Sequence, residues 1–334
     1  MNKSYYSPTD LNNFVSCKYH IKNDLQKDEL KLNKKEKNAN LKLRIEYGIQ
    51  HESNHFELLK IKYKKHITIN PNQSAEKKCA ETIKALKDGY DLIYKAYFVD
   101  NNFRGEVDFL LKIKSKSKLG DYSYEVHDTK ITKNLKPKHV LQITGYSYLL
   151  SKIQGFIPIK MYLIDGANIT HDFKVSEFLD YFLYTKDNFE KFLPKVEQID
   201  LYPEKCSFCN ICPWLDECEK IWVGDNYINQ ICGINVSQIT KLKKENIRTV
   251  EALATTEIND IKSKINPSTK IKLYEQAKLQ EEKRITGKSR FVINETENDK
   301  GLYKMPEPNV GDLFYDIEGF PQADKRNFEY LHGI

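Results

Sequence analysis

Residues 103–113 read FRGEVDFLLKI, and residues 124–132 read YEVHDTKIT. β-Branched and aromatic residues dominate both stretches, which is typical of β-strands. A third stretch of this kind, Leu92–Val99, precedes them, and the Asp100-Asn101-Asn102 segment that follows it is a hairpin-turn signal. We therefore predict an antiparallel meander with strands at 92–99, 103–113 and 122–129.

Segments with apolar residues at helical spacing lie on both sides of this meander. The predicted helices are 40–61, 74–93, 136–153 and 176–193, and a further strand is predicted at 157–164. Helices that flank a small mixed sheet form an α/β core. We expect this core to end near Pro203.

The composition is that of a globular protein. Hydrophobic residues make up 40% of the chain, enough for a core, and the 30% of charged residues are spread along it rather than collected in a disordered tail. The chain has no run of 18 apolar residues, and its start, MNKSYYSPTD, lacks the charged-then-apolar order of a secretory signal. We expect a cytoplasmic protein with no membrane partner.

The positive charge is concentrated in short lysine runs. The formal net charge is +6, and the runs include residues 60–65, 112–118, 130–138 and 241–244. Such runs suit a polyanionic partner. Solvated helix and strand faces explain any single run equally well, so charge alone does not select a nucleic acid.

Two acids and a lysine in the meander suggest chemistry. Asp108 lies among apolar residues, where an unpaired carboxylate is costly. Asp128 and Lys130 are two positions apart, so their side chains project to one face of a strand. If the strands are neighbours, Asp108 and Asp128 can hold Mg²⁺ or Mn²⁺, and Lys130 can orient or activate water that attacks a phosphodiester. An ordinary ladder of salt bridges would explain the same spacing.

Residues outside these positions add to the pattern. His51, on a predicted helix, could supply a metal ligand, while Gln142 and Tyr146 are neighbours at i and i+4 on a later helix. Glu106 and Glu125 are further acids near Asp108 and Asp128. Which acid binds metal therefore stays open.

Four cysteines form a compact motif. Cys206, Cys209, Cys212 and Cys218 follow the pattern C-x2-C-x2-C-x5-C. In a reducing compartment, such spacing indicates a metal centre rather than disulfides. Thiolates at this spacing can hold an iron–sulfur cluster or a structural Zn²⁺.

In chain order, these residues resemble the motifs of the RecB-like nucleases of the PD-(D/E)XK superfamily, especially the branch with clustered cysteines. The resemblance covers nearly the whole chain. It maps a helical His onto His51, a strand Asp onto Asp108, an acid-x-Lys pair onto Asp128-Thr129-Lys130, and a Q-x-x-x-Y helix onto Gln142 and Tyr146. It implies a restriction-endonuclease-like α/β core in which His51, Asp108 and Asp128 bind metal and Lys130, Asp108, Asp128, Gln142 and Tyr146 serve catalysis.

The resemblance also assigns the cysteines. It implies a 4Fe-4S cluster held by Cys17, Cys209, Cys212 and Cys218, which closes a nuclease domain at residues 1–222. Cys206 stays an alternative ligand in place of Cys17, and structural Zn²⁺ stays an alternative metal.

The remaining segments are expected to form accessory parts. Residues 223–285 read as short helices that resemble a helix-hairpin-helix element, and residues 286–310, with a Pro306/Pro308 pair, read as a linker. The strand predicted at 312–319 contains FYDIEG, and Asp316 and Glu318 in it resemble the first acidic motif of an RNase H-like exonuclease. Residues 311–334 would be the truncated start of such a domain. We expect the chain to be the front part of a longer protein.

Three functions compete at this point. The first is a metal-dependent DNA nuclease, of exonuclease or flap type on single-stranded DNA, acting in repair or recombination with a helicase in cis or in trans. The second is a non-catalytic module that holds DNA for such a helicase. The third, a zinc-stabilised RNA-binding protein, leaves Asp108 and Asp128 unexplained.

Overall fold

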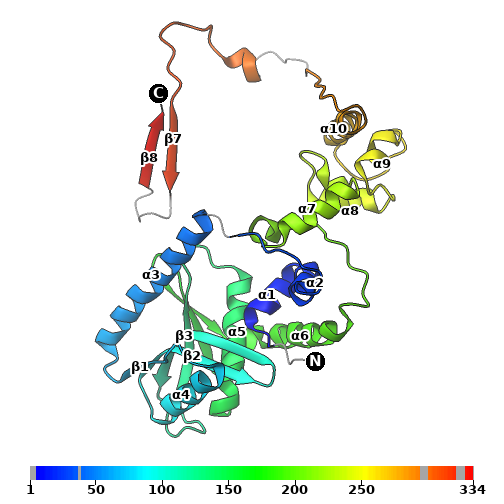
Figure 1. The fold of residues 1–334 in the computed structure, drawn as a ribbon. Coiled ribbons are helices and arrows are strands. Elements are labelled where there is room, and N and C mark those ends of the chain that lie inside the picture. The colour runs from blue at the N-terminus through cyan, green and yellow to red at the C-terminus, as the bar shows by residue number, and fades with distance from the viewer. Residues whose placement is uncertain (1–4, 37–38, 294–299, 321–327, 334) are drawn as a thin grey trace. The chain divides into compact units, whose positions relative to one another are not determined.

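The computed structural model describes residues 5–36, 39–293, 300–320 and 328–333. The chain divides into two compact units, Met1–Tyr202 and Pro203–Ile334 (Figure 1). The division lies ahead of the cysteine motif, whereas the sequence placed that motif at the end of the first domain. Each unit is described below by itself.

The first unit contains a six-stranded mixed sheet whose strands follow chain order. The strands are β1 (His66–Thr68), β2 (Leu92–Asp100), β3 (Phe103–Ile113), β4 (Ser123–Thr129), β5 (Lys160–Ile164) and β6 (Thr170–Lys174). The pairs β2–β3, β3–β4 and β5–β6 are antiparallel, and β1–β2 and β4–β5 are parallel. The predicted α/β class and the three-stranded meander are confirmed.

Local sequence explains the central hairpin. Asn101, between β2 and β3, has a φ of 55°, a left-handed conformation that asparagine adopts more readily than most residues. The turn residues Asn101 and Asn102 therefore let β2 reverse directly into β3. The pairing runs from Asp100 opposite Phe103 to Leu92 opposite Leu111.

Within the described residues of the first unit, six helices accompany the sheet. They are α1 (Pro8–Ser16), α2 (Lys18–Gln26), α3 (Ala39–Lys62), α4 (Ala75–Lys87), α5 (Pro137–Gln154) and α6 (Ser176–Phe192), the last followed by the 3₁₀ turn η1 (Leu193–Lys195). The helix predicted at 74–93 was too long, because the chain turns at Gly89 with a φ of 67° and enters β2. Helices α1 and α2 and strands β1 and β6 were not predicted.

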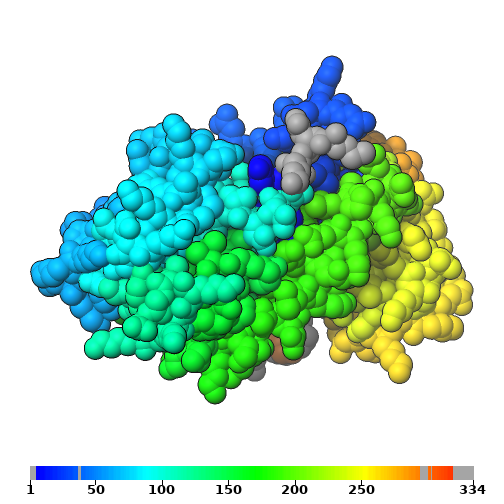
Figure 2. All heavy atoms as spheres, turned by 90° about the horizontal axis from the view of Figure 1, so that it is seen from below, coloured from blue at the N-terminus to red at the C-terminus, as the bar shows by residue number. Residues whose placement is uncertain are grey.

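The two faces of the sheet are covered by different helices. Helix α5 contributes Ile143 and Leu149 to the main core, where Leu110 and Val126 of the sheet are fully buried. Helix α3 packs through Phe56 and Leu59 on the other face, in a smaller cluster around Phe109. In Figure 2 the cyan and green residues of this unit form a continuous surface.

The second unit begins with short helices around two tryptophans. Its elements are η2 (Ser207–Ile211), α7 (Leu215–Gly224), η3 (Ile228–Gln230), α8 (Val236–Lys243), α9 (Val250–Thr255), α10 (Pro267–Thr286), η4 (Gly301–Lys304), β7 (Asp316–Phe320) and β8 (Phe328–Gly333). Trp214 and Trp222 are nearly fully buried, and Leu242 and Leu253 are buried on α8 and α9. Asn235 and Thr249 cap the starts of these two helices.

The end of the chain departs in detail from the sequence prediction. The predicted strand at 312–319 begins at Asp316 and pairs antiparallel with β8. Residues 294–299 of the predicted linker lie outside the described residues. Across the described ranges, no helix is both long and apolar enough to span a lipid bilayer.

Candidate active site

The meander brings Asp108 and Asp128 together on neighbouring strands. The backbone amide and the hydroxyl of Thr129 both donate hydrogen bonds to Oδ2 of Asp108, each at 2.9 Å. Lys130, directly after β4, forms an ion pair with Oδ2 of Asp128. One cluster of side chains thus contains Asp108, Asp128 and Lys130, as their spacing in the sequence predicted.

A break in the strand alternation shapes this cluster. Tyr94 pairs with Phe109, and both contact the α3 side, whereas the next pair, Ala96 and Val107, lies in the α5-side core. The side chains therefore change face between these two pairs. Lys95, at the break on β2, has a φ of 60°, a left-handed conformation that costs about 1–2 kcal/mol for a residue with a Cβ. Backbone strain of this kind is often found at functional sites.

Lys95 joins the cluster from β2 and connects it to α3. Its Nζ atom lies 2.5 Å from Oε1 of Glu52 and 3.4 Å from Oδ1 of Asp108. His51 of this helix was predicted from the sequence, whereas Glu52 and Lys95 were not. Glu52 could have been found as the acid adjacent to His51, whereas Lys95 carries no signal in a lysine-rich chain.

His51 directly precedes Glu52 on α3. Its Nε2 atom is buried and has no hydrogen-bond partner in the described part of the chain. His55, one turn further along α3, packs edge-on against the Phe109 ring at 5.4 Å. Burial, followed by the charge of His51, lowers the pKa of His55, while Asp108 opposes this shift. His55 therefore lies within electrostatic reach of Asp108.

Burial and crowding alter the protonation of the cluster. Asp128 is 2% exposed, and burial, followed by the charges of Asp108 and Glu52, raises its pKa to about 7 although Lys130 acts in the opposite direction. Burial lowers the pKa of Lys130, but Asp128 and Asp108 raise it more, so the pKa lies above its usual value. The lysine therefore stays charged, and the buried environment favours the protonated form of Asp128 more than water does.

The structure shows where Glu106 and Glu125 lie, the two further acids that the sequence left as possible metal ligands. Glu125 accepts hydrogen bonds from the Tyr162 hydroxyl at 3.1 Å and from the Lys160 amide at 3.2 Å. It is therefore held by β5. Glu106 lies at 3.2 Å from Lys78 and 3.9 Å from Lys95, at the outer edge of the cluster. Asp128 is thus the acid beside Lys130.

The predicted Gln142–Tyr146 pair forms on α5. The Gln142 amide donates to the Tyr146 hydroxyl at 2.7 Å, and Tyr146 is 6% exposed. Burial and then the charge of Asp128 raise the pKa of Tyr146, with a smaller contribution from Asp108. The Tyr146 hydroxyl is therefore protonated and lies within electrostatic reach of Asp128 and Asp108.

The donor set suits a hard divalent cation. Nε2 of His51, Oε1 of Glu52 and Oδ2 of Asp128 are buried and make no hydrogen bond within the described residues, although the two carboxylate oxygens form ion pairs with lysines. Carboxylate oxygens are the ligands that Mg²⁺ and Mn²⁺ prefer. As they stand, no three His, Cys, Asp or Glu side chains of either unit, among the residues described, are close enough together to hold a metal ion. Lys95 and Lys130 lie among these acids instead.

The cysteine motif folds around a short 3₁₀ turn in the second unit. Cys206 precedes η2 and Cys212 follows it, and the sulfur atoms of Cys206 and Cys209 are 3.9 Å apart. Cys218 is buried on α7. Cys17 belongs to the first unit, between α1 and α2. Its participation in a cluster stays a prediction.

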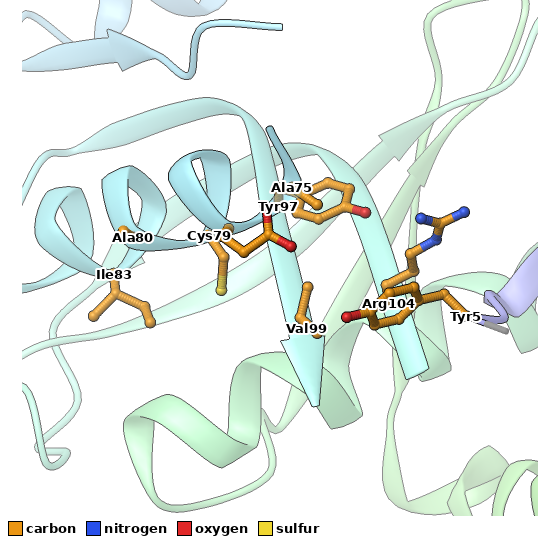
Figure 3. A pocket seen from close by; sticks show the side chains of 9 residues that line it. Tyr5, Ala75, Cys79, Ala80, Ile83, Tyr97, Val99 and Arg104 are labelled. Carbon is orange, nitrogen blue, oxygen red and sulfur yellow. The ribbon is translucent and has the colours of Figure 1, made fainter. Parts of the chain in front are cut away.

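A cavity of about 310 Å³ lies elsewhere in the first unit (Figure 3). Cys79, Ala80 and Ile83 of α4 line one side, and Tyr97, Val99 and Arg104 of the β2–β3 hairpin line the other, with Tyr5 beside Arg104. None of the predicted catalytic residues lines this cavity.

Comparison of the sequence with protein-family models and with curated proteins finds no match.

Proposed function

We propose that this chain is a metal-dependent DNA nuclease with a PD-(D/E)XK-type core, acting on single-stranded or free-ended DNA in repair or recombination. The observation that carries the proposal is the meeting of Glu52, Asp108 and Asp128 around lysine ammonium groups in one largely buried cluster. A salt-bridge ladder on a strand surface would not bury these acids. Several carboxylates beside a charged lysine can bind a divalent metal ion and promote phosphodiester hydrolysis.

Each residue has a specific task in this proposal. Asp108 and Asp128, with Glu52 or His51 from α3, are the ligands for Mg²⁺ or Mn²⁺, which when bound would polarise the scissile phosphate and acidify water. Lys130, whose ammonium is held by Asp128, orients the attacking water and offsets negative charge on the phosphate. The hydroxyl of Tyr146 already accepts a bond from Gln142, so its proton is available to a phosphate oxygen.

The cysteines would serve the same protein structurally. We propose that Cys17, Cys209, Cys212 and Cys218 hold a 4Fe-4S cluster, with Cys206 or a structural Zn²⁺ as the alternatives. The α8–α9 pair, whose joining segment has Asn246 at a φ of 61°, is the part proposed to contact the DNA backbone. We also propose a helicase partner and a cytoplasmic location for the protein.

A non-catalytic DNA-holding module is the second candidate. It is favoured by one observation, namely that Lys95 and Lys130 already neutralise the acids. Such a protein would bind DNA without cleaving it in any divalent metal.

Degradation of end-labelled single- and double-stranded DNA distinguishes the two candidates. The parent chain, Asp108→Asn and Lys130→Met would each be incubated with Mg²⁺, Mn²⁺ or EDTA. We expect metal-dependent cleavage by the parent chain and at least about a 100-fold loss in both variants, since each removes a group used in the chemical step.

The matched controls come from an acid–lysine pair elsewhere in the same sheet. Lys160 and Asp172 form an exposed ion pair at 2.7 Å between β5 and β6. Lys160→Met and Asp172→Asn should cleave at the parent rate. DNA binding without cleavage in every metal condition would establish the holding module instead.

A further inference from the structure

The position of Lys95 carries a consequence for metal binding. Lys95 lies 2.5 Å from Glu52 and 3.4 Å from Asp108, so its ammonium group lies between a carboxylate of α3 and a carboxylate of β3. These are two of the acids proposed to bind metal. A divalent cation at these carboxylate oxygens would lie next to the positive lysine ammonium, so the two cations compete for the same oxygens.

We propose that Lys95 is the resident counter-cation of the acid cluster, which must leave Glu52 and Asp108 before Mg²⁺ or Mn²⁺ can bind there. This inference rests on the proposed function and deepens it. It assigns to a residue outside the predicted catalytic set control over the metal affinity of the site.

The backbone conformation at Lys95 supports this role of its side chain. The φ of 60° at Lys95 coincides with the change of face between the pairs Tyr94–Phe109 and Ala96–Val107. In a strand with strict alternation, side chains two positions apart would lie on the same face along all of β2. The strained residue is thus the one whose side chain reaches the acids, and its ion pairs offset the strain.

A second partner is available to Lys95 when it leaves. Oε1 of Glu106 is 3.9 Å from the Lys95 ammonium, and Glu106 is 41% exposed at the outer edge of the cluster. The flexible lysine side chain can therefore move outward by a rotation of its own bonds while it keeps an opposite charge nearby. Lys78 already pairs with the other oxygen of Glu106, at 3.2 Å.

The test measures metal affinity without using activity. Mn²⁺ binding to the full chain, freed of divalent metal by dialysis, would be followed by the loss of the electron paramagnetic resonance signal of aqueous Mn²⁺. Lys95→Met keeps the aliphatic part of the side chain and removes the competing charge. We expect at least tenfold tighter Mn²⁺ binding and a lower melting temperature in EDTA, because Glu52 and Asp108 then repel each other without a cation.

Matched variants define what the result means. Lys78→Met removes a neighbouring lysine that contacts Glu106 in the same region, and it should leave Mn²⁺ affinity within about twofold of the parent value. Lys95→Gln, which retains polarity at the site, would replace Lys95→Met if that variant does not fold. It should also bind Mn²⁺ more tightly.

Two negative outcomes are distinct. If the parent chain binds Mn²⁺ and both Lys95 variants bind it equally or more weakly, this inference alone is overturned. Lys95 would then be a residue that stabilises the metal-bound state. Absence of binding in the parent chain and in all variants would overturn the proposed function together with the inference.

Discussion

Gly105 on β3 lies against the ring of Tyr146. A Cβ atom at this glycine would lie 2.8 Å from Cδ1 and 2.9 Å from Cε1 of the tyrosine, closer than such contacts occur. The absence of a side chain at 105 therefore sets how near α5 can approach the strand that carries Asp108. The position of the Tyr146 ring on α5 depends on this contact.

Gly105→Ala should consequently displace Tyr146 and lower DNA cleavage. We expect a loss of stability of about 1–3 kcal/mol from overpacking, measured by urea denaturation, and a fall in cleavage rate larger than the unfolded fraction explains. Gly48→Ala is the control, because nothing lies within 4 Å of the added methyl group on α3. It should raise stability by up to about 1 kcal/mol. Equal effects of the two substitutions would contradict the packing argument.

Substitution of Glu52 should weaken both metal binding and DNA cleavage. Because Glu52 contacts Lys95 in the acid cluster, Glu52→Gln should weaken Mn²⁺ binding by at least about tenfold and reduce cleavage in parallel. Glu57→Gln is the control on the same helix, since Glu57 is exposed and pairs locally with Lys60 at 2.7 Å. Parent-like metal affinity in Glu52→Gln, combined with a loss in His51→Gln, would assign the α3 ligand to His51.

Asp128 and Glu125, which the sequence could not separate, should behave differently on substitution. Asp128→Asn removes the partner of Lys130 and should abolish detectable cleavage. Glu125→Gln keeps one acceptor for Tyr162 or Lys160 and should cost about 1 kcal/mol of stability while cleavage continues. A cleavage defect in a fully folded Glu125→Gln protein would return Glu125 to the list of metal ligands.

His127 should make stability depend on pH. Its ring stacks on Tyr162 with centroids 4.1 Å apart, and burial, followed by the charges of His55 and Lys62, lowers its pKa to about 3. The folded state thus prefers neutral His127. The contribution of His127 to stability is greatest above about pH 6.5, where the unfolded residue is also neutral, and falls as the pH drops towards 3, by at most about 1.4 kcal/mol per pH unit.

His127→Phe retains an aromatic ring on Tyr162 and removes the titrating group. Urea midpoints measured by circular dichroism between pH 4.5 and pH 8 should fall less steeply with acid in this variant than in the parent chain. Identical slopes would show that other groups cause the acid sensitivity.

The cysteine assignment predicts a coloured protein. Anaerobic purification should give a brown chain with iron and sulfide, and Cys17→Ser should release the iron. Cys79→Ser, at the cavity on α4, should retain it. Iron that is lost in Cys206→Ser and kept in Cys17→Ser would exchange the two ligand assignments, and a colourless chain with one zinc ion would replace the cluster by a structural zinc site.

Sequence periodicity predicted the meander because β2, β3 and β4 are long and half or more of their residues are buried. β1 has only three residues, and exposed positions alternate along β6 from Thr170 to Lys174, so neither strand carries a strong apolar pattern. The end of α4 was misplaced because Leu92, the first residue of β2, was counted with Leu86 in one helical pattern. Here the turn at Gly89, rather than hydrophobicity, ends the helix.

The candidate site was predictable where it followed regular geometry. Asp128 and Lys130 obey strand alternation, and Gln142 and Tyr146 obey helical spacing, so both pairs meet as expected. Lys95 violates alternation through its positive φ, and Glu52 meets it only through tertiary packing. The adjacency of Glu52 to His51 could have drawn attention to this acid, but no local pattern predicts its contact with Lys95.

The agreement between strand order and chain order in the six-stranded sheet has a kinetic meaning. Lys95, Asp108, Asp128 and Lys130 all come from one meander, whose antiparallel pairings close short loops, whereas the parallel pairs β1–β2 and β4–β5 must enclose α4 and α5. Contacts between residues close in sequence form faster than distant ones. In pulsed hydrogen exchange during refolding, amides of β2, β3 and β4 should gain protection before those of β5. The acids would then be assembled before the helices that bury them have docked.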